Sequence, residues 1–336
     1  MESTYLLNQL NSGFTLFLSL MVEAIPFLLL GVLVSGLLLL FVDERKLIAF
    51  LPRHPLLGAL AGSVLGFLFP VCECGNVPVA RRLLMQGISA PVAIGFLLAA
   101  PTINPIVIWV TWTAFRDQPE IVVLRVLFSL VIATLVGWVF STQKNLKPFL
   151  QPAVANLLPS TSPAEELTLL QSGTYLLGQP GQPRRLEAAV FQAPSPVPKP
   201  WRDRLNLLLD NTIQELRELG GILVLGSLIA AFIQVVIPRE VVLSLGQGPV
   251  VSILVMMILG GIISICSTVD SFFALAFAST FTSGSLLAFL VFGPMFDLKS
   301  MGLILTIFRP RAMFYIFALV AQMVFLLTLL INLRFS

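Results

Sequence analysis

Long apolar runs constrain the fold of this chain more than any other feature. Several of them hold about 20 residues or more, which at 1.5 Å per residue is enough for a helix to cross the hydrocarbon core of a bilayer. Only 11% of the residues are charged, against roughly 25% in soluble proteins. The sequence therefore predicts an all-α polytopic membrane protein in contact with the lipid bilayer. No basic tract with interleaved aromatics is present, so nucleic acid is not predicted as a partner.

Six runs are long enough to cross, three in each half of the chain. A signal peptide would need a basic start and a shorter apolar core, so the first run is predicted to be a permanent span. The runs are Phe14–Phe41, Ser89–Phe115, Ile121–Phe140, Gly220–Ile237, Ser285–Phe308 and Ala312–Leu333.

Each half also contains shorter apolar pieces that flank a polar interruption. The interruptions are Phe69–Pro78 (FPVCECGNVP) and Ser264–Ser271 (SICSTVDS). The flanking pieces are Leu56–Val71 and Val77–Ile88 in the first half, and Val250–Ile265 and Phe272–Phe281 in the second. In the first half, neither piece is long enough to cross alone. We therefore expect three crossing helices plus a re-entrant or broken helical hairpin in each half.

Two of the six long runs carry a proline and a polar residue near their centre. Pro101–Pro105 (PTINP) and Gly293–Asp297 (GPMFD) predict unwound or kinked helices, because proline removes a backbone donor. At one constant offset between the halves, Asn104 falls opposite Asp297. This correspondence predicts an internal duplication. Since each half makes three crossings, the two repeats are expected to be inverted.

The predicted domain organisation is a first membrane repeat at 1–140, a linker at 141–200 and a second membrane repeat at 201–336. Ten of the 23 prolines fall in the linker, together with many Gln and Ser residues, which favours a mobile spacer with a short helix near Ala164–Leu170. The second repeat is predicted to begin with an amphipathic surface helix at Trp201–Leu219.

The distribution of basic residues predicts the orientation. The loop at 42–55, the linker with its flanks and the corner Arg309–Arg311 hold most of the Lys and Arg residues, which places them in the cytoplasm. The N-terminus, the corner Arg116–Glu120 and the loop at Arg239 are expected outside. The predicted location is the inner or plasma membrane. His54, the one histidine, is interpreted as a solvated loop residue.

All three cysteines, Cys72, Cys74 and Cys266, lie in the two polar interruptions. Thiolates are soft ligands suited to copper(I), zinc or trivalent arsenic, so these residues are predicted to bind a thiophilic substrate or metal. The alternative is that each buried cysteine only packs as a small hydrophobe. No resident cofactor is predicted.

Four carboxylates are predicted to lie at membrane depth. Glu23, Glu73, Asp270 and Asp297 would be costly there as charged groups, and desolvation would favour their protonated forms, so they are candidates for proton coupling. Asn76, Asn104, Ser267 and Thr268 either bind substrate or cap half-helices. The full candidate substrate-binding set is Cys72, Glu73, Cys74, Asn76, Asn104, Cys266, Ser267, Thr268 and Asp270.

The motifs at Pro70–Pro78 and Pro101–Pro105 resemble those of the predicted-permease family that includes the organoarsenical efflux permease ArsP and the YraQ-type permeases. The resemblance covers both membrane halves and excludes the linker. It implies a polytopic inner-membrane permease, and within the family the ArsP members export trivalent organoarsenicals.

Together, these features predict a secondary transporter rather than an enzyme. It would export a small thiophilic solute by alternating access around a central site of cysteines and carboxylates. No Walker-type nucleotide loop is present, so ATP-driven transport would need another subunit. The alternative function is a membrane-embedded thiol-disulfide oxidoreductase in which the three cysteines relay electrons. Whether the protein forms a homo-oligomer is left open.

Overall fold

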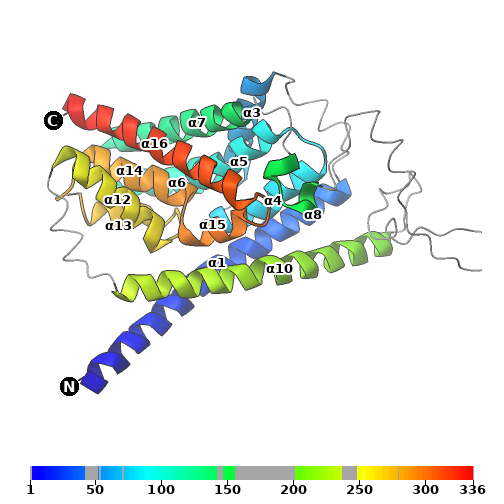
Figure 1. The fold of residues 1–336 in the computed structure, drawn as a ribbon, viewed down its shortest axis with the longest axis horizontal. Helices are drawn as coiled ribbons and strands as arrows, with labels where there is room; N and C mark the ends of the chain where they lie inside the picture. The colour runs from blue at the N-terminus through cyan, green and yellow to red at the C-terminus, as the bar shows by residue number, and fades with distance from the viewer. Residues whose placement is uncertain are drawn as a thin grey trace, which may run out of the picture.

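In a computed structural model, the described part of the chain comprises residues 2–41, 52, 54–69, 72–141, 147–155, 201–236, 248–278 and 280–335. Every regular element in it is a helix, which confirms the predicted all-α class (Figure 1). The first-half elements are α1 (Glu2–Phe41), α3 (Pro55–Leu68), α4 (Glu73–Met85), α5 (Ala90–Ile103), α6 (Pro105–Ala114) and α7 (Pro119–Ser141). Two short elements follow, η1 (Lys147–Phe149) and α8 (Pro152–Ala155). The second-half elements are α10 (Trp201–Val236), α12 (Pro249–Ile263), α13 (Asp270–Leu275), α14 (Ser283–Met295), α15 (Leu298–Ile304) and α16 (Pro310–Phe335).

Six helical segments are long and apolar enough to cross a membrane, three in each half as predicted. They are Gln9–Leu37, Ala90–Ala114, Pro119–Ser141, Leu208–Val235, Ser283–Ile304 and Pro310–Arg334. The apolar helices α3 and α12 have 14 and 15 residues. At 1.5 Å per residue each reaches roughly 21 to 23 Å, short of a hydrocarbon core of about 30 Å. The chain is therefore a multi-pass membrane protein with two additional short apolar helices.

Two of the six spans are broken where the sequence predicts. The first is interrupted at Asn104, whose Oδ1 accepts a hydrogen bond of 2.9 Å from the Val107 N–H and so caps α6. The second is interrupted before α15, where Asp297 Oδ1 accepts a hydrogen bond of 2.6 Å from the Ser300 N–H. Both caps satisfy N–H groups that the break leaves without helical partners. Asn104 and Asp297, which correspond at the offset between the halves, thus perform the same structural role.

The first polar interruption is shorter than the sequence predicts. Helix α4 begins at Glu73 and continues through Pro78, whereas the following helical piece was expected to start only at Val77. Pro78 is the sixth residue of α4, so it removes the backbone hydrogen bond that the Cys74 carbonyl would otherwise accept. Pro70 and Val71 lie outside the described residues. In the second half, α13 covers Asp270–Leu275 instead of the expected Phe272–Phe281.

The segment predicted as an amphipathic surface helix that leads into the next span is helical and continuous with that span. Helix α10 runs without a break, and its membrane-spanning part already begins at Leu208. Its polar residues contact the first half of the protein, since Glu218 pairs with Arg81 at 3.0 Å and Glu215 accepts a hydrogen bond of 3.5 Å from Ser35. Amphipathic spacing in this segment therefore reflects packing against other helices.

The beginning of the predicted linker packs against the membrane helices. Leu150 is fully buried and forms an isolated antiparallel bridge with Phe308, and its carbonyl accepts a hydrogen bond of 3.0 Å from Arg309 Nε. The rest of the linker from 156 to 200, including the predicted helix at Ala164–Leu170, lies outside the described residues. His54 is exposed at the start of α3, as expected of a solvated loop residue.

The short helices bring the two halves together. Helix α4 contacts α1 and α5 of its own half and α15 of the other half. In the same way α13 contacts α14 of its own half and α6 of the other half. The beginnings of α4 and α13, which carry the two polar interruptions, therefore lie inside the helical assembly rather than at its surface.

The crossing of α1 and α4 depends on two glycines. A Cβ atom on Gly31 of α1 would lie 2.2 Å from the Gly75 carbonyl oxygen in the first turn of α4. That distance is far below van der Waals contact, so the two backbones touch with no space for a side chain. This contact fixes the start of α4 against α1.

We predict that Gly31→Ala destabilises the protein by about 1–3 kcal/mol through overpacking. Gly221→Ala is the matched control, because nothing lies within 4 Å of a Cβ atom at Gly221 and alanine favours a helix by about 0.5–1 kcal/mol over glycine. Thermal unfolding of the purified variants in detergent measures both effects. Equal midpoints for the two variants would contradict the close crossing.

Candidate functional site

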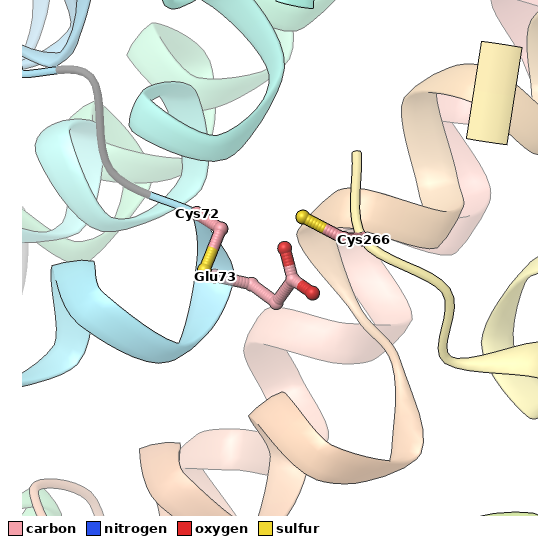
Figure 2. Close-up of side chains that lie close together, drawn as sticks. All are labelled: Cys72, Glu73 and Cys266. Carbon is pink, nitrogen blue, oxygen red and sulfur yellow. The ribbon is translucent and has the colours of Figure 1, made fainter. Parts of the chain in front are cut away.

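Two thiols and a carboxylate from opposite halves of the chain meet inside the helical assembly. Donor atoms of Cys72, Glu73 and Cys266 all lie within 4.8 Å of one another. The side chains are buried, with exposed fractions of 5%, 2% and 3% respectively. In Figure 2 the Glu73 carboxylate, at the start of α4, points toward Cys266. The predicted convergence of sulfur and carboxylate from the two interruptions is therefore present.

The start of α4 holds the first two members of this cluster. Cys72 is the N-cap residue, and its carbonyl accepts hydrogen bonds from the N–H groups of Gly75 and Asn76 at 3.1 and 3.2 Å. Glu73 is the first residue of the helix. The partial positive charge of a helix N-terminus thus lies at the thiol and the carboxylate.

A sharp turn after α12 holds the third member. Ser264 ends α12 in the left-handed region, with φ of 50°, a strained conformation for a residue with a side chain. Its Oγ accepts a hydrogen bond of 3.1 Å from the Leu298 N–H of α15. The Cys266 carbonyl then accepts hydrogen bonds from the N–H groups of Val269 and Asp270 at 2.9 and 3.0 Å. These bonds fix the backbone that presents the Cys266 thiol.

Charged side chains surround the cluster. Lys299 of α15 is 2% exposed and interacts electrostatically with Glu23, Glu73, Cys74 and Asp297. Glu23, which is partly buried on α1, also interacts with the Cys266 thiol. Glu73 Oε2 and Asp297 Oδ2 are buried without a hydrogen-bond partner. Buried polar atoms are normally paired, so these two oxygens are available to a ligand or a proton.

Three of these four charged residues, Glu23, Glu73 and Asp297, were predicted from the sequence, and Lys299 was not. The signal was present, because Lys299 is a cation inside the apolar run Ser285–Phe308, two residues after Asp297. A charged residue at such a position is a candidate functional residue on its own.

The structure distributes the other predicted ligands differently. Cys74 is 1% exposed and interacts with Cys72 and Lys299, but it is not part of the closely spaced set of donors. The predicted metal ligands were Cys72, Cys74 and Cys266. The residues whose donor atoms lie within 4.8 Å of one another are Cys72, Glu73 and Cys266. Thr268 Oγ1 lies 3.6 Å from Cys266 Sγ, and the buried Ser267 Oγ has no hydrogen-bond partner.

The two asparagines serve the backbone of the broken span. Pro101 has no N–H, so the Leu97 carbonyl four residues earlier lacks its helical donor, and Asn76 Nδ2 donates to it at 2.8 Å. Asn104 caps α6 and also donates to the Ala100 carbonyl at 3.3 Å. Asn104 therefore fits the capping alternative, while Asn76 keeps one unpaired buried atom, Oδ1.

Asp270 lies in a separate buried ion pair. Arg125 of α7 donates to both carboxylate oxygens, Nη2 to Oδ2 at 2.7 Å and Nη1 to Oδ1 at 3.3 Å. Nη1 also donates to Thr111 and Ser271 at 2.7 and 2.9 Å. Arg125 was not predicted as a functional residue, although it is the one charged residue inside the run Ile121–Phe140. Unlike Glu73, the Asp270 carboxylate has its charge already balanced.

Comparisons with known proteins agree over almost the entire chain. A family model described as "Predicted permease" (ArsP_1) matches residues 9–333. The UPF0718 protein YcgR of Bacillus subtilis (strain 168) is 34% identical over 331 residues, which cover 98% of this chain and 99% of that protein. A Streptococcus mutans serotype c (strain ATCC 700610 / UA159) protein named "Putative two-component membrane permease complex subunit" is 30% identical over 296 residues, 88% of this chain and 87% of that protein. No solved structure matches.

We predict that Asp270→Asn costs about 3–5 kcal/mol of stability, because it leaves the Arg125 guanidinium buried without its counter-ion. The double variant Arg125→Met, Asp270→Leu removes both charges and is expected to lose less than the sum of the single variants. Glu218→Gln, which breaks the more exposed pair with Arg81, is the control and should cost at most about 1 kcal/mol. Thermal unfolding in detergent measures all four proteins, and additive losses would argue against a coupled pair.

We also predict that Asn76→Ala costs about 1–3 kcal/mol, because the Leu97 carbonyl is then buried without a donor. Adding Pro101→Ala supplies an N–H at the position that serves this carbonyl, so the double variant should recover part of the loss. The same unfolding measurement tests this. A double variant less stable than Asn76→Ala alone would show that Asn76 has another role.

Proposed function

The chain belongs to the ArsP_1 family of predicted permeases and is a membrane transporter, and we propose that it exports a small thiophilic solute such as a trivalent organoarsenical. Membership of a permease family favours transport over an enzymatic activity. The proposed cell location is the inner or plasma membrane. The linker would be cytoplasmic and the N-terminus outside, following the distribution of basic residues.

The convergence of Cys72, Glu73 and Cys266 carries this proposal. Two thiols from opposite halves, with donor atoms no more than 4.8 Å from each other and from the carboxylate, suit one soft centre bound by both halves. An arsenic(III) species of the form R–As=O would form two As–S bonds, and its oxygen would leave as water with the two thiol protons. A substrate held in this way would depend on both halves of the transporter.

Alternating access of two inverted repeats is the proposed transport mechanism. The duplicated caps at Asn104 and Asp297 support it, as do the contacts that each short helix, α4 and α13, makes with the opposite half. In Figure 1 both ends of the chain lie at the left of the view, which fits an even number of crossings. With three crossings per half, the second half would start from the opposite side of the membrane. Rocking of one half against the other would separate Cys72 from Cys266 and release the substrate.

Proton exchange is proposed at Glu73 rather than at Asp270. Glu73 is 2% exposed and has one oxygen without a hydrogen-bond partner, so burial favours its neutral form and substrate binding can change its proton. Asp270 is neutralised by Arg125 and is proposed to hold α13 in place. Glu23 and Asp297 stay candidates as neighbours of the same cluster, and homo-oligomerisation stays a prediction.

The function is tested by measuring the transport of a trivalent methylarsenical into everted vesicles or proteoliposomes. We predict that Cys72→Ser and Cys266→Ser each lower the initial rate about tenfold or more, since each removes one of the two sulfur ligands. Cys74→Ser is the matched control, because this buried thiol lies outside the closely spaced donors, and it should retain most of the rate. Full activity of the Cys72→Ser, Cys266→Ser double variant would refute a thiol site.

The same preparation distinguishes the alternative oxidoreductase. A transporter should turn over with Cys72 and Cys266 as free thiols, which is their state here. A Cys72–Cys266 disulfide that forms and disappears with each turnover would favour electron relay instead. Alkylation of thiols under denaturing conditions during turnover reports which state is populated.

A further inference from the structure

Lys299 is a buried cation whose charge interacts with the carboxylates of this site. Its charged neighbours come from three different elements: Glu23 from α1, Glu73 from α4, and Asp297 at the start of α15. The Cys74 thiol of α4 is a fourth neighbour. The donor atoms of Cys72, Glu73 and Cys266 lie within 4.8 Å of one another, a set that suits a soft divalent cation.

The lysine is held in this position by the packing of α15. Its side chain is 2% exposed, although lysines in membrane helices usually extend toward the aqueous interface. Helix α10 passes so close behind it that a Cβ atom on Gly226 would lie 3.3 Å from the Lys299 Cα. The Lys299 backbone is therefore packed against α10, and its side chain is shielded from water.

We propose that Lys299 is a specificity-determining residue, a built-in cation that excludes divalent metal ions and leaves the thiols to a neutral thiophilic substrate. This inference rests on the proposed function, because it names the charge class of the substrate at the same site. A divalent ion bound by Cys72, Glu73 and Cys266 would be repelled by the positive charge of Lys299, which interacts electrostatically with Glu73. Charge repulsion in a poorly solvated interior is strong, whereas an uncharged arsenic(III) species does not meet it.

Binding to the purified full-length protein in detergent tests this inference with two probes. Cd²⁺ is a soft divalent ion whose binding is followed by thiolate-to-cadmium absorption, and phenylarsine oxide is a neutral arsenic(III) reagent that binds two thiols. The neutral variants Lys299→Met and Lys299→Gln should bind Cd²⁺ about tenfold tighter or more than the wild type, because one buried positive charge is removed. Their reaction with phenylarsine oxide should be unchanged. Lys299→Arg keeps the charge and should behave as the wild type.

Competition on the wild type provides a test that does not depend on the folding of a variant. Cd²⁺ should fail to protect Cys72 and Cys266 from phenylarsine oxide when the two are at equal concentration. Protection at that ratio would overturn the inference, as would unchanged Cd²⁺ affinity in the neutral variants or a gain in Lys299→Arg. If phenylarsine oxide does not react with Cys72 and Cys266 in the wild type, the proposed function fails instead, and the cadmium comparison still decides the role of Lys299.

Discussion

Inside a bilayer, backbone N–H and C=O groups must find partners within the protein, because lipid offers none. Each broken helix of this protein therefore requires polar residues nearby. Asn104 and Asp297 cap the second halves of two spans, and Asn76 donates to the carbonyl that Pro101 leaves free. These requirements draw polar side chains to the centre of an apolar protein, so the backbone breaks and the candidate site occupy the same region.

The two halves use their polar interruptions differently. In the second half, both oxygens of the Asp270 carboxylate accept hydrogen bonds from Arg125. This ion pair holds the start of α13 against α7. In the first half, Glu73 retains an oxygen without a hydrogen-bond partner beside two thiols, and it interacts electrostatically with Lys299. The start of α13 therefore holds the two halves together, whereas the start of α4 carries groups that can exchange partners.

Much of this arrangement could be predicted from the sequence, because apolar length and helix-breaking residues are local signals. The six spans, the breaks at Asn104 and Asp297 and the convergence of Cys72 with Cys266 follow from them. Partners could not be predicted in the same way. Nothing near Asp270 in the sequence indicates that Arg125, 145 residues away, balances its charge, and Lys299 gains its meaning only from carboxylates on α1 and α4. Amphipathic spacing also does not identify its partner. It suggested a helix at the membrane surface before the span, whereas Glu215 and Glu218 of α10 contact Ser35 and Arg81 of the first half.

Two ion pairs between the halves, both among the described residues, differ in strength, which bears on how an enclosed site can open. Arg125 and Asp270 are almost fully buried, and separating them would leave two charges without partners in a poorly solvated interior. Arg81 and Glu218 are a more exposed pair between α4 and α10, and water can replace each partner at little cost. If the halves rock as proposed, the contact between α4 and α10 is thus the easier one to break. Helix α4 also carries Cys72 and Glu73, so movement at that contact would change the distance from these groups to Cys266 while the Arg125–Asp270 ion pair stays closed.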